Sequence, residues 1–183
     1  MLLTFNPALL DEVRRRVSIQ VRAYPPTFFR YPSASPAKER KLELLHVGSL
    51  GQHHPRRRSL VTTLQSRGRL PFRHTITTNA EEASELYAQF ALVLNVPLNN
   101  DLNHRFFEVM AVGVPQVVFS DPGLTGDNRA LAERSDVFWT SSIEELEELV
   151  LRLFAEPNKL KRIPACPPAY LELKELLKAA LAP

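Results

Sequence analysis

Residues 92–119, LVLNVPLNNDLNHRFFEVMAVGVPQVVF, decide the fold of this chain. The stretch begins inside an apolar run, Ala91 to Val96, which is too short for a helix and is followed by Pro97. A short apolar run that is bounded in this way predicts a buried strand. A second apolar run, residues 116–119, predicts another strand at the far end of the stretch.

The residues between these two runs predict a helix. Asn103 is a good N-cap, because its side-chain oxygen can accept a hydrogen bond from an unpaired amide of the first turn. Gly113 is placed to end a helix over residues 104–112, and Pro115 prevents its continuation. Strand, helix and strand in so short a stretch predict a βαβ unit, which requires parallel strands and a right-handed crossover.

The same alternation of strands and helices extends over residues 41–154. It predicts an α/β fold, namely a Rossmann-like parallel sheet with helices on both faces. A dinucleotide fold of the NAD type is disfavoured, because the first glycine loop lacks Gly-x-Gly-x-x-Gly and no acidic residue ends the second strand. The other predicted strands are 42–47, 69–78 and 136–140, and the other predicted helices are 55–66, 80–89, 128–134 and 143–157.

The helix over residues 143–157 has the most complete set of signals. Ser141 with Glu144 and Ser142 with Glu145 both have the spacing of a capping box. We interpret the acidic run Glu144 to Glu148 as a first turn favoured by the helix dipole, followed by a solvated face. Its predicted buried stripe consists of Ile143, Leu146, Leu149, Val150 and Leu153.

Residues 1–40 differ from the rest of the chain. A short helix is predicted over residues 9–17 and a strand over residues 17–24, and a proline-rich segment follows them. We therefore predict an N-terminal segment with a proline-rich linker over residues 1–40, and one Rossmann-like domain with a C-terminal helix over residues 41–183.

The composition is that of an ordinary globular domain, with 44% hydrophobic and 23% charged residues in 183. No apolar stretch approaches the ~20 residues of a membrane span, and the N-terminus lacks the order of a signal peptide, so we expect a cytoplasmic protein. Cys166 is the only cysteine, which excludes a disulfide framework and a cysteine metal site. His53 and His54 have no carboxylate at a supporting spacing, so no metal is expected. The net charge of +3 suits a phosphate-bearing ligand and does not require nucleic acid.

The first group of candidate ligand-binding residues follows the predicted strand 42–47. Ligands of open α/β sheets bind beyond the carboxyl ends of the strands. Gly48, beside Ser49, removes a side chain where the backbone must approach a ligand, and the start of the next helix offers amides to a phosphate. Arg56 and Arg57, with the neighbouring Arg58, lie in the first turn of that helix.

The second group follows the strand at 91–96. The loop 98–103, which contains Asn100, and the N-terminus of the next helix lie at the same edge of the sheet. Helical spacing places His104 and Glu108 on one face of this helix, with Arg105 beside them.

Residues 105–118, RFFEVMAVGVPQVV, resemble the sugar-nucleotide-binding segment of GT-B glycosyltransferases. That family has Glu, an optional Ala, Met, Ala, any residue, Gly, any residue and Pro, followed by a hydrophobic strand. The pattern is similar to that of the spore-maturation-type glycosyltransferase-like group. The residues that match the version of this group are Asn103, Arg105, Phe107, Glu108, Met110, Ala111 and Gly113.

This resemblance implies the C-terminal, donor-binding half of a GT-B fold. In the family, the residue that matches Glu108 contacts the nucleotide ribose, and the glycine turn with a following arginine holds the diphosphate. Many retaining members carry another Glu where this chain has Asn100, so no catalytic residue is assigned. The predicted substrate-binding residues are Gly48, Ser49, Arg56, Arg57, Asn100, Asn103, His104, Arg105 and Glu108.

Two functions remain open from the sequence. In the first, the domain binds a nucleotide-diphosphate sugar and transfers the sugar together with an acceptor-binding domain, which lies on a longer chain or on another subunit. No cofactor or metal is needed beyond this co-substrate. In the second, the domain keeps the GT-B scaffold as a non-catalytic nucleotide-binding or protein-interaction module. Whether the chain is an active enzyme is left undecided at this stage.

Overall fold

The computed structural model describes residues 2–4, 10–23, 31–35, 37–97, 103–120 and 134–161. Its main element is a five-stranded parallel sheet with the strand order β4-β3-β5-β6-β7. The strands are β3 (Lys41–Val47), β4 (Phe72–Thr75), β5 (Phe90–Asn95), β6 (Gln116–Phe119) and β7 (Val137–Thr140).

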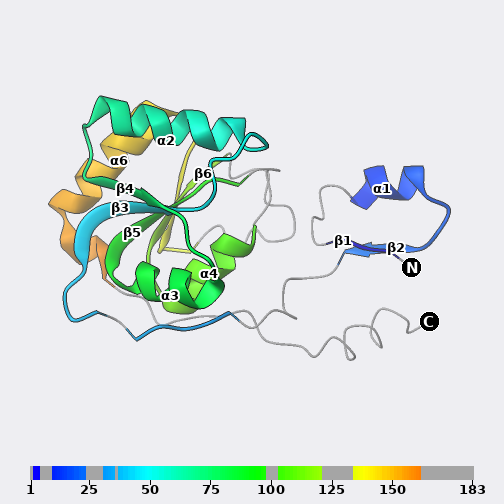
Figure 1. Ribbon diagram of the computed structural model, residues 1–183, viewed down its shortest axis with the longest axis horizontal. Helices are drawn as coiled ribbons and strands as arrows, with labels where there is room; N and C mark the ends of the chain where they lie inside the picture. The colour runs from blue at the N-terminus through cyan, green and yellow to red at the C-terminus, as the bar shows by residue number, and fades with distance from the viewer. Residues whose placement is uncertain are drawn as a thin grey trace.

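Helices cover both faces of this sheet (Figure 1). One face is covered by α2 (Pro55–Arg67) and α6 (Ile143–Ala155), and the other by α3 (Ala80–Ala88) and α4 (His104–Val112). A short 3-10 helix, η5 (Pro157–Leu160), follows α6. The predicted α/β, Rossmann-like architecture is therefore confirmed.

Apolar packing on the two faces explains why the central strand is buried along its whole length. Every residue of β5 is buried, as expected for a strand that is covered on both sides. On one face Leu92 and Leu94 pack in the same cluster as Leu60 of α2 and Leu146 of α6. On the other face, Val93 packs with residues of α3 and α4.

The predicted helix ends agree well with the structure. Asn103 accepts a hydrogen bond from the Phe106 amide at the start of α4, and Gly113 ends this helix in the left-handed conformation with φ 71°. Ser142 and Glu145 form both bonds of the predicted capping box at α6. These ends depend on local chemistry, which is why sequence alone identifies them.

The edge strand β4 is shorter than the predicted strand over residues 69–78. It ends at Thr75, and Thr78 belongs instead to the N-terminus of α3. There the Glu82 carboxylate accepts hydrogen bonds from the backbone amide and the hydroxyl of Thr78, both at 2.8 Å. Helix capping therefore competes successfully with strand extension at this point.

A second, two-stranded parallel sheet forms near the N-terminus. It pairs β1 (Leu2–Thr4) with β2 (Val21–Ala23), and α1 (Leu10–Arg16) connects them. The strand predicted over residues 17–24 is thus reduced to its last part. Residues 98–102 with Asn100, nearly all of the predicted helix 128–134, and the C-terminal helix lie outside the described residues.

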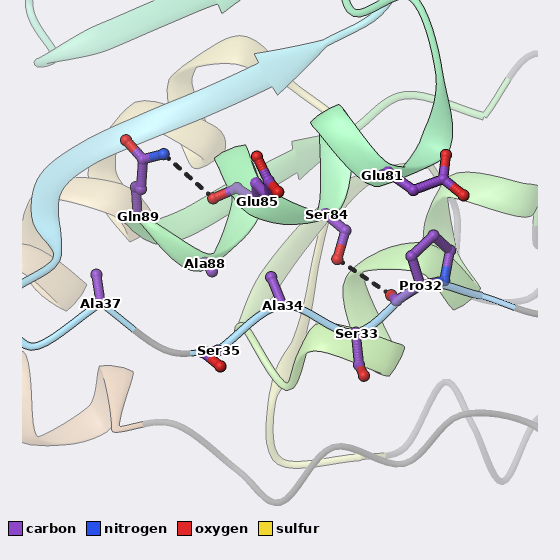
Figure 2. A pocket seen from close by; sticks show the side chains of 10 residues that line it. All are labelled: Pro32, Ser33, Ala34, Ser35, Ala37, Glu81, Ser84, Glu85, Ala88 and Gln89. Carbon is purple, nitrogen blue, oxygen red and sulfur yellow. Dashed lines mark hydrogen bonds between the residues drawn. The ribbon is translucent and has the colours of Figure 1, made fainter.

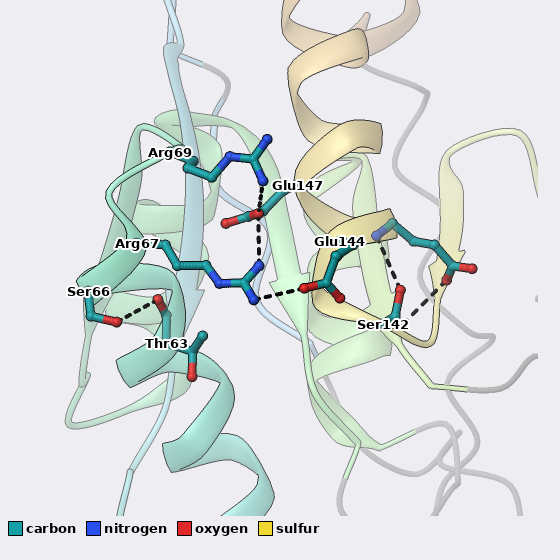
Figure 3. Close-up of polar contacts among 8 residues, drawn as sticks. Thr63, Ser66, Arg67, Arg69, Ser142, Glu144 and Glu147 are labelled. Carbon is teal, nitrogen blue, oxygen red and sulfur yellow. Dashed lines mark hydrogen bonds and ion pairs between the residues drawn. The ribbon is translucent and has the colours of Figure 1, made fainter.

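The interpretation of the acidic run in α6 as a solvated face is wrong for Glu147. Its side chain is only 1% exposed, and its Oε2 atom accepts hydrogen bonds from Arg67 at 3.2 Å and Arg69 at 2.9 Å (Figure 3). Arg67 also bonds Glu144 at 2.8 Å. These contacts tie the C-terminal end of α2 to α6, and they depend on tertiary packing that the helical pattern does not contain.

Glu147→Gln should destabilise the domain by about 1.5–3 kcal/mol, because it removes the charged acceptor of two arginines at a buried position. Glu144→Gln, on the same helix but with a side chain that is 63% exposed, should have a much smaller effect. Urea unfolding of both variants and the unmodified protein measures the difference. Equal losses of stability would show that the buried contacts of Glu147 contribute no more than the exposed contact of Glu144.

Candidate functional site

The strand order places a topological switch point between β3 and β5. The chain leaves β3 through α2 on one face of the sheet and leaves β5 through α4 on the other face (Figure 1). Connections that diverge in this way leave a crevice beyond the carboxyl ends of the two strands, where ligands of such folds bind. Both groups of predicted residues belong to the segments that follow these strands.

Gly48, directly after β3, is required by a close approach of Arg105. Its φ is +146°, a conformation that side-chain-bearing residues rarely adopt. A Cβ atom here would lie 2.8 and 2.9 Å from the two terminal nitrogens of the Arg105 guanidinium. The glycine therefore lets an arginine of α4 cross the backbone at the end of β3.

Arg57 reaches the same crevice from α2. Its residue is only 6% exposed, and its guanidinium donates to the Ser49 carbonyl at 3.3 Å and the Val96 carbonyl at 3.1 Å. Those carbonyls belong to the segments after β3 and β5, so one side chain connects both sides of the switch point. Burial, aided by the charge of Arg105, lowers the pKa of Arg57 to about 10, which keeps it positive at neutral pH.

The positive charge of these two arginines is not neutralised by a carboxylate of the described residues. None of the ion pairs in the described ranges includes Arg57 or Arg105, and the Nε atoms of both are buried without a hydrogen-bond partner there. In addition, the N-terminus of α2 has no side-chain cap at His54. A buried and a half-buried cation that pair with no described carboxylate together favour a bound anion.

Asn103 has a structural role that explains the position of α4. Besides capping the helix, it exchanges two amide hydrogen bonds with Asn95 at the end of β5, both of 3.1 Å. Its side-chain oxygen thus already accepts from Asn95 and from the Phe106 amide. The pair fixes the first turn of α4, and with it Arg105, against the central strand.

The remaining predicted residues of α4 contact neighbouring aromatic residues. His104 Nδ1 lies 3.2 Å from the Tyr31 hydroxyl. Glu108 is half-buried and accepts a hydrogen bond of 3.3 Å from the Tyr87 hydroxyl of α3. Its carboxylate is thereby held about one helical turn beyond the start of α4, on the side facing α3.

The family model of glycosyl transferase-like proteins matches residues 35–166, which covers the whole five-stranded sheet and both arginines. The chain belongs to the glycosyl transferase-like family. No match was found among curated proteins. Membership in this family supports a role in sugar transfer in general.

The structure of this glycosyl transferase-like domain separates the predicted arginines. Arg105 lies against Gly48 and Arg57 bonds the carbonyls of Ser49 and Val96, whereas Arg56 lies over the Phe119 ring, 5.5 Å from its centroid, near the end of β6. Arg58 is exposed and donates to the Leu50 carbonyl at 2.8 Å. Consecutive positions of a helix point about 100° apart, so of the arginines 56–58 only Arg57 points toward the switch point.

Ser49 contributes mainly through its backbone. Its hydroxyl accepts a hydrogen bond from the Gly51 amide at 3.1 Å, while its carbonyl binds Arg57. The serine thus shapes the turn after β3. Asn100, the other predicted residue of the loop after β5, lies outside the described residues.

The sequence interpretation missed two histidines in the same region. His46 is fully buried; its Nδ1 donates to the Leu94 carbonyl at 3.0 Å, and its Nε2 has no partner in the described part of the chain. Its ring stacks on His74 with 5.5 Å between centroids. A polar residue two positions before Gly48 in an apolar strand was the available signal.

Other kinds of site find no support within the described ranges. No group of three or more histidine, cysteine, aspartate and glutamate residues that could hold a metal occurs there. No described helix is long and apolar enough to cross a bilayer. A groove of about 600 Å³ lies between residues 32–37 and α3, but none of the predicted site residues lines it (Figure 2).

His46 should make the stability of the domain depend on pH. Burial, together with the charges of Arg105 and Arg57, lowers the pKa of His46 to about 3. Between about pH 6.5 and about pH 3 the unfolded chain therefore binds a proton that the folded protein excludes, so stability is complete above this window and falls as the pH falls. The expected loss between about pH 7 and about pH 5 is about 2 kcal/mol.

Urea unfolding at these two pH values measures this contribution. In His46→Asn the side-chain amide can still donate to the Leu94 carbonyl, but it does not titrate. The variant should therefore lose clearly less stability on acidification than the unmodified protein. Identical losses in the two proteins would contradict the assignment to His46.

Proposed function

We propose that this glycosyl transferase-like domain binds the nucleotide-diphosphate sugar donor of a glycosyltransferase, as the C-terminal half of a GT-B fold of the spore-maturation type. The observation that supports the proposal best is the convergence of Arg57 and Arg105 at the switch point of the sheet, where Arg105 lies against Gly48 and Arg57 bonds the Val96 carbonyl. The family match independently supports sugar transfer.

In this proposal, Arg105 contacts the diphosphate directly. Its guanidinium lies against Gly48, where no side chain covers the backbone, and it can offer parallel N–H groups to phosphate oxygens. Arg57 is more deeply buried and already bonds two carbonyls, so it holds the two loops and adds positive charge beneath them. The N-terminus of α2 adds the positive end of its helix dipole at the same edge of the sheet.

Glu108 is proposed to bind the ribose. A carboxylate accepts hydrogen bonds from adjacent hydroxyl groups, and the position of Glu108 on α4 is one turn from Arg105. That separation suits a nucleotide whose phosphates lie at the start of the helix. His104 lies at the first position of the same helix, and Asn103 acts by fixing this turn.

Catalysis in this proposal is mainly electrostatic. When the sugar leaves, negative charge develops on the diphosphate, and positive groups already in place stabilise it without rearrangement. The acceptor must be supplied by another domain or another subunit. No described residue is assigned as a nucleophile or a general base, and neither a cofactor nor a metal enters the proposed chemistry.

A non-catalytic nucleotide-binding module is the second candidate function. It is favoured by Asn100, which stands where many retaining relatives of the GT-B type have a glutamate. The two functions predict the same nucleotide binding and differ only in transfer. Adding an acceptor-binding partner and assaying sugar release distinguishes them.

Calorimetric titration of the full chain with a panel of nucleoside mono- and diphosphates tests the proposed site. At least one nucleoside diphosphate should bind with a dissociation constant below ~1 mM. Arg105→Ala should weaken it by about 1.5–3 kcal/mol, because a charge-assisted hydrogen bond is lost, and should affect the corresponding nucleoside much less.

Arg73→Ala is the matched control, since Arg73 is an exposed arginine of β4 that pairs with Glu43. It should leave nucleotide affinity unchanged. Absence of binding across the whole panel would refute the donor site. Equal effects of Arg105→Ala on nucleoside and nucleoside diphosphate would place the phosphates elsewhere.

A further inference from the structure

Tyr87 occupies a position that the proposed function does not yet explain. Its ring is completely buried in the apolar cluster between β3, β5, α3 and α4. Its hydroxyl nevertheless faces α4 and donates to Glu108 Oε2 at 3.3 Å. Apolar packing explains the position of the ring, but not why its hydroxyl bonds the carboxylate that is proposed to bind ribose.

Arg105 interacts with the same hydroxyl. Burial raises the pKa of Tyr87 to about 12, the nearby guanidinium opposes this effect, and Glu108 adds to it. The phenol therefore stays protonated and remains a hydrogen-bond donor at neutral pH. The hydroxyl therefore interacts at the same time with Arg105 and with Glu108, the two charged residues of the proposed site.

Arg105 and Glu108 do not pair directly with each other. They are three positions apart on α4, a spacing at which oppositely charged side chains commonly pair. No ion pair within 4.0 Å joins these two described side chains. Instead, Arg105 lies on Gly48 and Glu108 bonds Tyr87.

We propose that Tyr87 is a positioning residue that keeps Arg105 and Glu108 apart, so that the arginine stays available to phosphate and the carboxylate to ribose. The inference rests on the proposed function for the identity of the ligand. The physical argument does not depend on the ligand. The Tyr87 hydroxyl donates to Glu108 and interacts with Arg105, so it competes with a direct ion pair between these two side chains. Direct pairing would neutralise both groups and withdraw both from the ligand.

Tyr87→Phe removes this hydroxyl while keeping the ring in the core. In this variant a ribonucleoside diphosphate should bind about 3- to 10-fold more weakly, the effect of one hydrogen bond. The 2′,3′-dideoxy analogue should bind nearly as it does to the unmodified protein, so the preference for ribose falls. In a Glu108→Gln background, Tyr87→Phe should change this preference no further.

Ser84→Ala is the matched control, because Ser84 is a buried hydroxyl of the same helix that donates to the Pro32 carbonyl at 3.1 Å, away from Glu108. It should leave the ribose preference intact. A purely structural role of Tyr87 would lower the melting temperature without changing that preference. An unchanged preference in Tyr87→Phe therefore overturns the proposal.

A crystal structure of Tyr87→Phe provides the second measurement and needs no ligand. The proposal expects Arg105 and Glu108 to approach within about 4 Å, the range of an ion pair. If they stay apart, Tyr87 does not separate them. If the unmodified protein binds no nucleotide, the proposed function fails, and this distance still decides whether Tyr87 keeps the two side chains apart.

Discussion

Two neighbouring guanidinium groups, of buried Arg57 and half-buried Arg105, are the constraint at the edge of the parallel sheet on which the rest of the site depends. Arg57 and Arg105 approach each other from helices on opposite faces, and no described carboxylate pairs with either. Such an arrangement persists only if the surrounding structure holds both side chains in place. The carbonyls of Ser49 and Val96 hold Arg57, and the missing side chain at Gly48 accommodates Arg105.

The fold supplies the elements that hold these groups. The Asn95–Asn103 pair fixes the start of α4 to the central strand, and the contacts of Glu147 with Arg67 and Arg69 fix α2 to α6. Helix α4, which carries Arg105, is thus attached to the sheet, and helix α2, which carries Arg57, is attached to α6. The positive charge at the switch point is then held in place by the fold itself, which is the kind of preorganisation that the proposed function uses.

Much of this architecture could be predicted from the sequence, because it depends on local chemistry. The apolar run before Pro97, the cap at Asn103 and the stop at Gly113 define the central βαβ unit. The strand alternation then predicts a parallel sheet, and its carboxyl edge is the expected place for a ligand. Arg57 and Arg105 were both among the predicted residues.

What could not be predicted depends on contacts between elements distant in the sequence. The orientation of α2 selects Arg57 over Arg56, and the packing of α3 on α4 brings Tyr87 to Glu108. The burial of Glu147 likewise arises from two arginines near the end of α2. Helical periodicity predicts on which face of its helix a residue lies. It does not predict which residues of other elements that face contacts.

The most direct test of the site at the switch point is an NMR titration of the isotopically labelled full chain with the tightest-binding nucleoside diphosphate. The largest shifts are expected for the backbone amides of Gly48 and Arg105 and for the side-chain NεH of Arg57. The groove between residues 32–37 and α3 should be unaffected. Shifts confined to that groove, or none near Gly48 at saturating ligand, would contradict a phosphate site at the switch point.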